Sequence, residues 1–192
     1  MDQRFDASEY RYRLIYRDNY RTISSALLEM LPFDTVLDLG CANGFLLEDF
    51  AVAGKAVRGV ELSPDVRDFL PEILQDRVTL DDAVTLGKVG QFDLVCCVEV
   101  AEHVPPESSQ GLVDTIVANA SRWIYFTAAS PCQEGTGHIN CRQQFFWLNE
   151  FRKRGVDLEW EYTDRFLGAI RGLQPAVWLE WNSLILRVAG AK

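Results

Sequence analysis

Apolar and polar positions divide this chain into short apolar runs that alternate with longer amphipathic segments. The runs predict five strands, at residues 35–39, 56–62, 77–80, 92–98 and 123–128. Helical periodicity predicts helices at residues 44–53, 109–120 and 142–154, and a further helix interrupted at Pro71 after the capping pair Ser63-Pro64. Strands that alternate with helices in this way are typical of a parallel sheet covered on both faces.

The last third of the chain departs from this alternation. Residues 156–166 and 180–189 are strand-like runs joined by a loop with no long helix, which predicts an antiparallel pair. We therefore expect an α/β three-layer sandwich with a mostly parallel seven-strand sheet whose last strand pair is antiparallel. Residues 1–192 are expected to form a single domain, with a helical cap at 1–31 and a catalytic core at 32–192.

A helix predicted from about residue 9 to residue 30 precedes the first strand. Spacing by four places three tyrosines on one face and three arginines on the neighbouring face, namely Tyr12, Tyr16, Tyr20, Arg13, Arg17 and Arg21. In one interpretation the tyrosines pack on the sheet and the arginines face water. In the other, the helix covers a cleft and its basic face admits an anionic acceptor.

The segment TVLDLGCANGFLLEDF, at residues 35–50, combines an apolar strand, a small-residue turn and a helix. Gly40 and Gly44 allow a tight turn beside which a ligand can approach the backbone. Glu61 follows Gly40 by 21 residues, near the spacing at which an acid meets ribose hydroxyls in nucleoside-binding folds. Asp38 would repel a pyrophosphate and would suit a cationic amino-acid group. The turn therefore predicts a nucleoside cofactor that carries an ammonium group.

This segment resembles the first motif of class I S-adenosylmethionine-dependent methyltransferases, whose fold is Rossmann-like. The resemblance implies that Asp38 and the turn hold the methionine part of S-adenosylmethionine and that Glu61 holds the ribose. It implies that Asp82 and Ala83, with Asp81 as a near-equivalent of Asp82, meet the adenine. The cofactor-binding residues expected on this basis are Asp38, Gly40, Cys41, Ala42, Asn43, Gly44, Glu61, Leu62, Asp82, Ala83, Val98 and Glu99.

After the fourth strand, Glu99, Glu102 and His103 would share a helical face if the chain turns there. The segment resembles the E-x-x-E-H element of small-molecule methyltransferases, including ubiquinone-biosynthesis O-methyltransferases. It also resembles the metal-binding element of small-RNA 2′-O-methyltransferases. Three roles remain open for His103: a general base, a metal ligand, or a structural group that shapes the loop.

The second histidine, His138, lies in a glycine-containing loop after the fifth strand. We expect His103 and His138 to be the catalytic residues. The resemblance to the small-RNA enzymes implies a divalent-metal alternative, whose ligands would be Glu99, Glu102, His103 and His138.

Composition narrows the classes of partner and the compartment that we expect for this protein. The net charge of −9 disfavours nucleic acid, and five cysteines, an odd number, indicate reduced thiols in place of a disulfide framework. No apolar run approaches membrane-spanning length and the first ten residues are too polar for a signal peptide, so we expect a cytoplasmic protein without a membrane partner. The oligomeric state is left open.

The sequence predicts an S-adenosylmethionine-dependent methyltransferase that acts on a small-molecule acceptor, with hydroxyl methylation favoured. Three alternatives stay open: a metal-assisted RNA 2′-O-methyltransferase, an NAD(P)-dependent oxidoreductase, and a cofactor-binding module without turnover. A missing middle glycine at Ala42 and the terminal strand pair count against the oxidoreductase.

Overall fold

A seven-stranded sheet forms the centre of the computed structural model, which describes residues 5–191. The strand order is β3-β2-β1-β4-β5-β7-β6. The strands are β1 (Thr35–Leu39), β2 (Ala56–Glu61), β3 (Val78–Leu80), β4 (Phe92–Val98), β5 (Ala120–Thr127), β6 (Val156–Leu158) and β7 (Leu184–Val188). Strands β1 to β5 pair in parallel, whereas β7 is antiparallel to both β5 and β6. The predicted α/β fold with an antiparallel last pair is confirmed.

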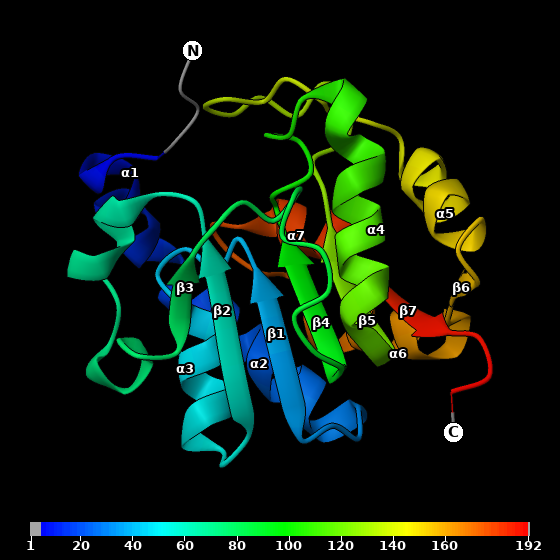
Figure 1. Cartoon of the computed structure of the whole chain (residues 1–192), viewed down its shortest axis with the longest axis horizontal. Helices are drawn as coiled ribbons and strands as arrows, with labels where there is room; N and C mark the ends of the chain where they lie inside the picture. The colour runs from blue at the N-terminus through cyan, green and yellow to red at the C-terminus, as the bar shows by residue number, and fades with distance from the viewer. Residues whose placement is uncertain (1–4, 192) are drawn as a thin grey trace.

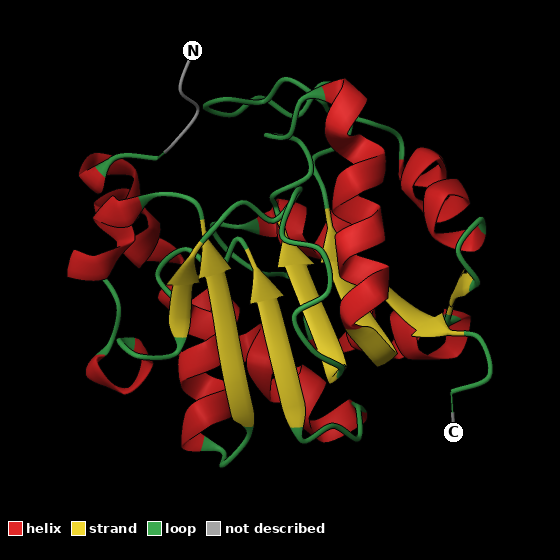
Figure 2. Cartoon of the chain, viewed as in Figure 1, coloured by secondary structure: helices red, strands yellow, loops and turns green. Residues whose placement is uncertain are grey.

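Helices cover both faces of the sheet, as Figures 1 and 2 show. Alternate residues of β4 explain the three layers, because Leu94 and Cys96 join one core cluster while Val95 and Cys97 join the other. The first cluster receives side chains from α2 (Arg17–Met30), α3 (Phe45–Val52), α6 (Trp160–Ala169) and α7 (Val177–Asn182). The second receives them from α4 (Ser109–Asn119) and α5 (Gln144–Arg152). Within residues 5–191, every helix is too short or too polar to cross a bilayer.

The N-terminal helical segment is confirmed, with one interruption. It consists of α1 (Ala7–Arg13), a single 3₁₀ turn η1 (Leu14–Tyr16) and α2. The Asp6 carboxylate caps α1 by accepting hydrogen bonds from the amides of Ser8 and Glu9. Residues 1–4 of the predicted cap lie outside the described residues.

Hydrogen bonds attach α1 to the carboxyl-terminal edge of the sheet. The Asn43 side-chain amide donates to the Tyr10 carbonyl at 3.0 Å, and the Ser63 hydroxyl donates to the Phe5 carbonyl at 2.7 Å. In Figure 1, α1 and the loop between β5 and α5 lie at the end of the sheet toward which the arrowheads of β1, β2 and β4 point. The N-terminal segment thus contributes side chains to the edge where parallel α/β sheets bind ligands.

Two predictions for the last third of the chain are wrong in detail. Residues 156–166 are not one strand, because α6 begins at Trp160 and buries Thr163, Phe166 and Ile170 at helical spacing. Residues 180–182 belong to α7, so helices and not a simple loop connect β6 to β7. The segment after Ser63 forms two 3₁₀ turns, η2 (Pro64–Asp68) and η3 (Glu72–Leu74), in place of the predicted helix, with Pro71 between them.

Candidate functional site

The turn after β1 has the left-handed backbone that its glycines allow. Gly40 has φ +75° and Gly44 has φ +71°, and Ala42 between them has φ +44°, which a residue with a Cβ rarely adopts. A Cβ on Gly40 would collide with the Val100 side chain. A strained residue inside a packed turn is typical of a functional site.

A cavity of about 300 Å³ opens beside this turn, and we call it the strand-edge cavity. It lies at the carboxyl ends of β1, β2, β3 and β4. Six of the residues predicted to bind a cofactor line it together with Glu99, namely Gly40, Ala42, Glu61, Leu62, Asp82 and Ala83. Asp81 lines it as well and is more exposed than Asp82, whose carboxylate accepts a hydrogen bond from the Val84 amide at 2.8 Å.

Backbone amides fix the Glu61 carboxylate in this cavity. Its Oε1 accepts from the amides of Leu62 at 2.8 Å and Ser63 at 3.2 Å, and its Oε2 accepts from the Ala42 amide at 2.9 Å. A carboxylate offers about four acceptor positions, so one remains for a ligand hydroxyl. The local chain therefore orients Glu61 before any ligand arrives.

A second, small cavity of about 20 Å³ adjoins the turn, and we call it the Asp38 cavity. The predicted residues Asp38, Cys41, Asn43 and Val98 line it. Burial, and then the nearby charge of Glu61, raises the pKa of Asp38 to about 7. A carboxyl group in this state is suited to a cationic partner. Gly44 lines neither cavity and is instead the N-cap residue of α3.

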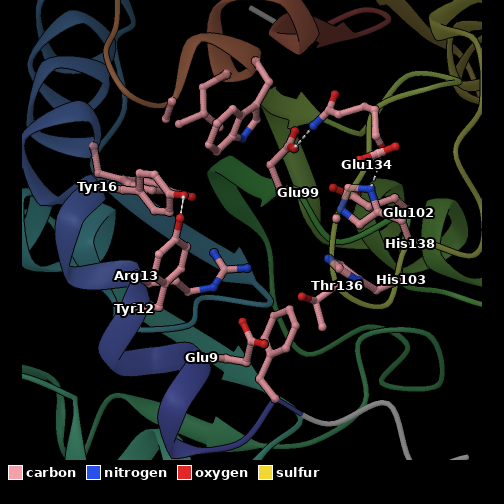
Figure 3. Close-up of a pocket in the computed structure, with 17 residues that line it drawn as sticks. Glu9, Tyr12, Arg13, Tyr16, Glu99, Glu102, His103, Glu134, Thr136 and His138 are labelled. Atoms are coloured by element: carbon pink, nitrogen blue, oxygen red, sulfur yellow. Dashed lines mark hydrogen bonds between the residues drawn. The ribbon is translucent and has the colours of Figure 1, made fainter.

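The largest of these three cavities, about 370 Å³, lies between the N-terminal segment and the loop of residues 128–143. We call it the aromatic cavity. Figure 3 shows Tyr12, Arg13 and Tyr16 on one side and Glu99, His103 and His138 on the other. The Tyr16 ring packs edge-on to Trp178 of α7, with ring centroids 5.4 Å apart. The aromatic and strand-edge cavities share Phe5, Arg13, Glu99 and His103.

Both histidines meet a buried acid in the aromatic cavity. Ligand atoms of Glu102, His103 and His138 lie within 4.8 Å of one another. Both carboxylate oxygens of Glu102 are buried and have no hydrogen-bond partner among residues 5–191. Burial and the neighbouring Glu99 raise the pKa of Glu102. This carboxyl group could therefore bind a hydrogen-bond donor or a cation.

The histidine rings are held by the loop backbone. His103 Nδ1 lies 3.2 Å from the Gly137 carbonyl, and His138 Nδ1 lies 2.9 Å from the Gln133 carbonyl. Burial, and then the neighbouring His138, lowers the pKa of His103 to about 4, so this ring is neutral at pH 7. A neutral ring that donates Nδ1–H to a carbonyl keeps a lone pair on Nε2.

Glu99 is bound more firmly than its neighbours. Its Oε1 accepts from Asn182 at 3.1 Å and its Oε2 accepts from Gln133 at 3.1 Å, while Asn182 also donates to Gln133 Oε1 at 2.9 Å. The residue has a left-handed backbone, with φ +53°. Glu99 is therefore less free to ligate a metal than the other three predicted ligands.

Several lining residues were not identified from the sequence, among them Phe5, Gln133 and Trp178. The helical face that carries Arg13, Arg17 and Arg21 indicated the cavity lining only in part. Arg13 lines all three cavities, but Arg17 pairs with Glu48 and Asp49, and Arg21 pairs with Asp18. Of the two interpretations, a basic face that meets a ligand therefore rests on Arg13, because Arg17 and Arg21 line none of the three cavities.

Comparison with known proteins adds a family match. A family model described as a methyltransferase domain matches residues 10–134. The ubiquinone biosynthesis O-methyltransferase of Bordetella parapertussis is 33% identical over 99 residues, which cover 48% of this chain and 41% of the relative. The same enzyme of Paraburkholderia xenovorans is 32% identical over 102 residues, covering 48% and 43%. The chain thus spans less than half of the length of these curated relatives.

Solved structures share the fold. The magnesium protoporphyrin IX methyltransferase of Synechocystis, crystallised with S-adenosylmethionine, aligns with a TM-score of 0.65 at 20% identity, covering 92% of this chain and 80% of that chain. An S-adenosylmethionine-dependent methyltransferase of Clostridium acetobutylicum aligns with a TM-score of 0.70 at 13% identity, covering 94% and 98%.

Proposed function

This chain belongs to the methyltransferase domain family, and on that premise we propose that it transfers the methyl group of S-adenosylmethionine to a hydroxyl group of a small molecule. The observation that carries the proposal is the junction of two cavities. The strand-edge cavity has the groups to hold the cofactor, and the aromatic cavity, which shares His103 with it, can hold the acceptor.

The residues of the cofactor side fit S-adenosylmethionine. Asp38, with its raised pKa, would pair with the ammonium group, because a cation favours the ionised carboxylate. Glu61 would accept a hydrogen bond from the ribose, and Asp82 lies at the strand end where the adenine amino group would be read. When bound, the cofactor supplies a methyl group already activated by a sulfonium, so the chain must mainly align the acceptor and exclude water.

On the acceptor side, His103 can take the proton of the substrate hydroxyl. His103 is neutral at pH 7, so its free ring nitrogen can take that proton as the new O–C bond forms. A pKa of about 4 makes this imidazole a weak base, however. Support from a second group would therefore help the acceptor oxygen to become nucleophilic.

We propose a divalent metal as an alternative way to activate the acceptor oxygen; His103 would then bind the metal through Nε2 and the hydroxyl proton would leave to solvent, because one nitrogen lone pair cannot do both. Two imidazoles and a carboxylate form a mixed N,N,O set that several divalent metals accept, and Glu102 brings two buried oxygens without a hydrogen-bond partner within residues 5–191. Backbone carbonyls orient both rings through Nδ1, the arrangement usual for metal-binding histidines. Chelator treatment should lower both activity and melting temperature, and Mn²⁺ or Mg²⁺ should restore both. If neither quantity responds to EDTA, the metal has no role.

Arg13 supports the sequence-based expectation of an anionic acceptor. It lines every cavity described above, and no ion pair within residues 5–191 engages it. It could therefore bind an anionic group of the acceptor or of the cofactor.

The central experiment is a calorimetric titration with S-adenosylmethionine, S-adenosylhomocysteine and NADH in parallel, followed by an acceptor screen that detects S-adenosylhomocysteine. We expect binding of the first two ligands and methylated product. NADH binding alone would support the oxidoreductase alternative, and cofactor binding without any turnover would support a binding module. An RNA acceptor is disfavoured by the net charge of −9.

A further inference from the structure

The aromatic cavity is lined by charged groups of both signs, which donate and accept hydrogen bonds. Arg13 supplies a guanidinium, and Glu9 and Glu134 supply carboxylates, while Glu102 is assigned to the proposed metal. Within residues 5–191, Arg13, Glu9 and Glu134 are not joined to one another by an ion pair or hydrogen bond. A ligand in this cavity therefore meets donors and acceptors that do not satisfy each other.

Aromatic rings line the same side of the cavity as Arg13. Tyr12 packs edge-on to Tyr16 with centroids 5.8 Å apart, and Tyr16 packs edge-on to Trp178. The hydroxyls of the two tyrosines lie 3.3 Å apart, and the Tyr12 side chain is 58% exposed. The wall thus combines a limited apolar surface with phenolic groups that donate and accept.

These features discriminate between classes of acceptor. An alkyl or prenyl tail would bury the carboxylates without supplying donors, which costs free energy for each group left unpaired. A cationic acceptor would satisfy the carboxylates but would face Arg13 with like charge. Hydroxyl groups both donate to carboxylates and accept from a guanidinium, and the C–H faces of a saturated ring can pack on aromatic side chains.

We propose that the acceptor is a polyhydroxylated, carbohydrate-type molecule, an inference that rests on the proposed methyl transfer to a hydroxyl group. The match to the family model ends at residue 134, whereas Thr136, His138 and Trp178 line this cavity beyond it. Part of the acceptor side is therefore built from residues that the family match does not describe.

The test uses the full chain saturated with S-adenosylhomocysteine and ligand-observed NMR to detect binding. The probes are neutral hexosides, hexuronic acids, an amino sugar and a catechol with a long alkyl tail. We expect the hexosides or hexuronic acids to bind, and to be methylated when S-adenosylmethionine replaces the product. Glu134→Ala should weaken sugar binding about tenfold, the loss typical of one hydrogen bond to a charged group. The control Glu72→Ala, at an exposed position that does not line the cavity, should bind the sugars normally.

Each other outcome overturns the inference. If the alkyl catechol binds and the sugars do not, the acceptor is of the lipid-tailed phenol class. Binding of the amino sugar without the neutral hexosides would assign the cavity to a cationic acceptor. Failure of every sugar to bind, in a protein that binds S-adenosylhomocysteine normally, removes the carbohydrate assignment and leaves the proposed function intact. Failure to bind S-adenosylhomocysteine itself removes the proposed function instead.

Discussion

The strand-edge cavity and the aromatic cavity share four residues but are assembled in different ways. The first is lined mainly by residues at or directly after the ends of β1, β2, β3 and β4, so that each strand end supplies at least two residues. The second brings together the N-terminal helices, the loop of residues 128–143 and α7. The proposed cofactor side therefore depends on short motifs, whereas the proposed acceptor side depends on contacts between distant parts of the chain.

Replacing either histidine should give the largest effect on kcat, because both side chains are assigned to the acceptor side and the cofactor side would stay intact. We expect His103→Ala and His138→Ala each to lower kcat by about 10²–10⁴-fold, the usual contribution of a group that moves a proton or holds a reacting centre. The affinity for S-adenosylhomocysteine should stay near wild type. Rapid-quench or product assays give kcat and calorimetry gives the affinity. An equal loss in both measurements would mean that the two cavities are not functionally separable.

Removing the Asp38 charge should break the cofactor side. We expect Asp38→Asn to weaken S-adenosylmethionine about 10- to 100-fold, because a buried ammonium would lose its carboxylate partner. The pKa of about 7 adds a pH test: the ionised form binds the ammonium, so wild-type affinity should rise as the pH rises through about 7. Calorimetry between pH 5.5 and 7.5, about two units spanning that pKa, should show this rise in the wild type and not in Asp38→Asn. A pH-independent wild-type affinity would contradict the assignment.

Sequence alone was sufficient for most of the strand-edge side. The G-C-A-N-G turn, Glu61 and Asp82-Ala83 are local signals, because each lies within a few residues of a strand end. The central strands β1 and β4 were also recognisable as largely apolar runs, which is expected for strands buried on both faces.

The acceptor side could not be predicted to the same extent. Trp178 lies in a segment expected to be a loop, and residues 160–166 of α6 were mistaken for strand because Trp160, Tyr162 and Phe166 also suit a strand. Gln133 and Asn182 are polar residues 49 positions apart whose role appears only when the fold joins them. Nothing in the spacing of such residues indicates that they meet.

Asn182 offers a way to test that long-range assembly. Asn182→Ala would remove its hydrogen bonds to Glu99 and Gln133, and the Gln133 carbonyl in turn holds His138. We expect the acceptor KM to rise about tenfold as the loop loses its connection to α7, with cofactor affinity unchanged. Steady-state kinetics at saturating cofactor measures this. Asn182→Gln should restore part of the loss if hydrogen bonding and not packing is responsible, and no rescue would indicate a purely structural role.

The smallest expected effect separates two arginines on the same helical segment. Arg17 is held by Asp49 at 2.5 Å and by Glu48 at 3.0 Å, so Arg17→Gln should lower the free energy of unfolding by about 1–2 kcal/mol with little change in KM. Arg13 has no such partner within residues 5–191 and lines the cavities, so Arg13→Gln should leave the unfolding free energy near wild type.

For an anionic acceptor such as a hexuronic acid, Arg13→Gln should raise KM a few-fold, and more at low than at high ionic strength. The reason is that salt already screens a half-exposed charge, with a Debye length of about 10 Å at 0.1 M and about 3 Å at 1 M. A neutral hexoside should show a smaller, salt-independent change, because only a hydrogen bond to a hydroxyl would be lost. Urea unfolding and KM measured at two salt concentrations for both variants separate the roles. If Arg17→Gln changes KM as much as Arg13→Gln does, the basic stripe acts as a unit, and the acceptor side depends on the whole N-terminal segment and not on its cavity-lining residues alone.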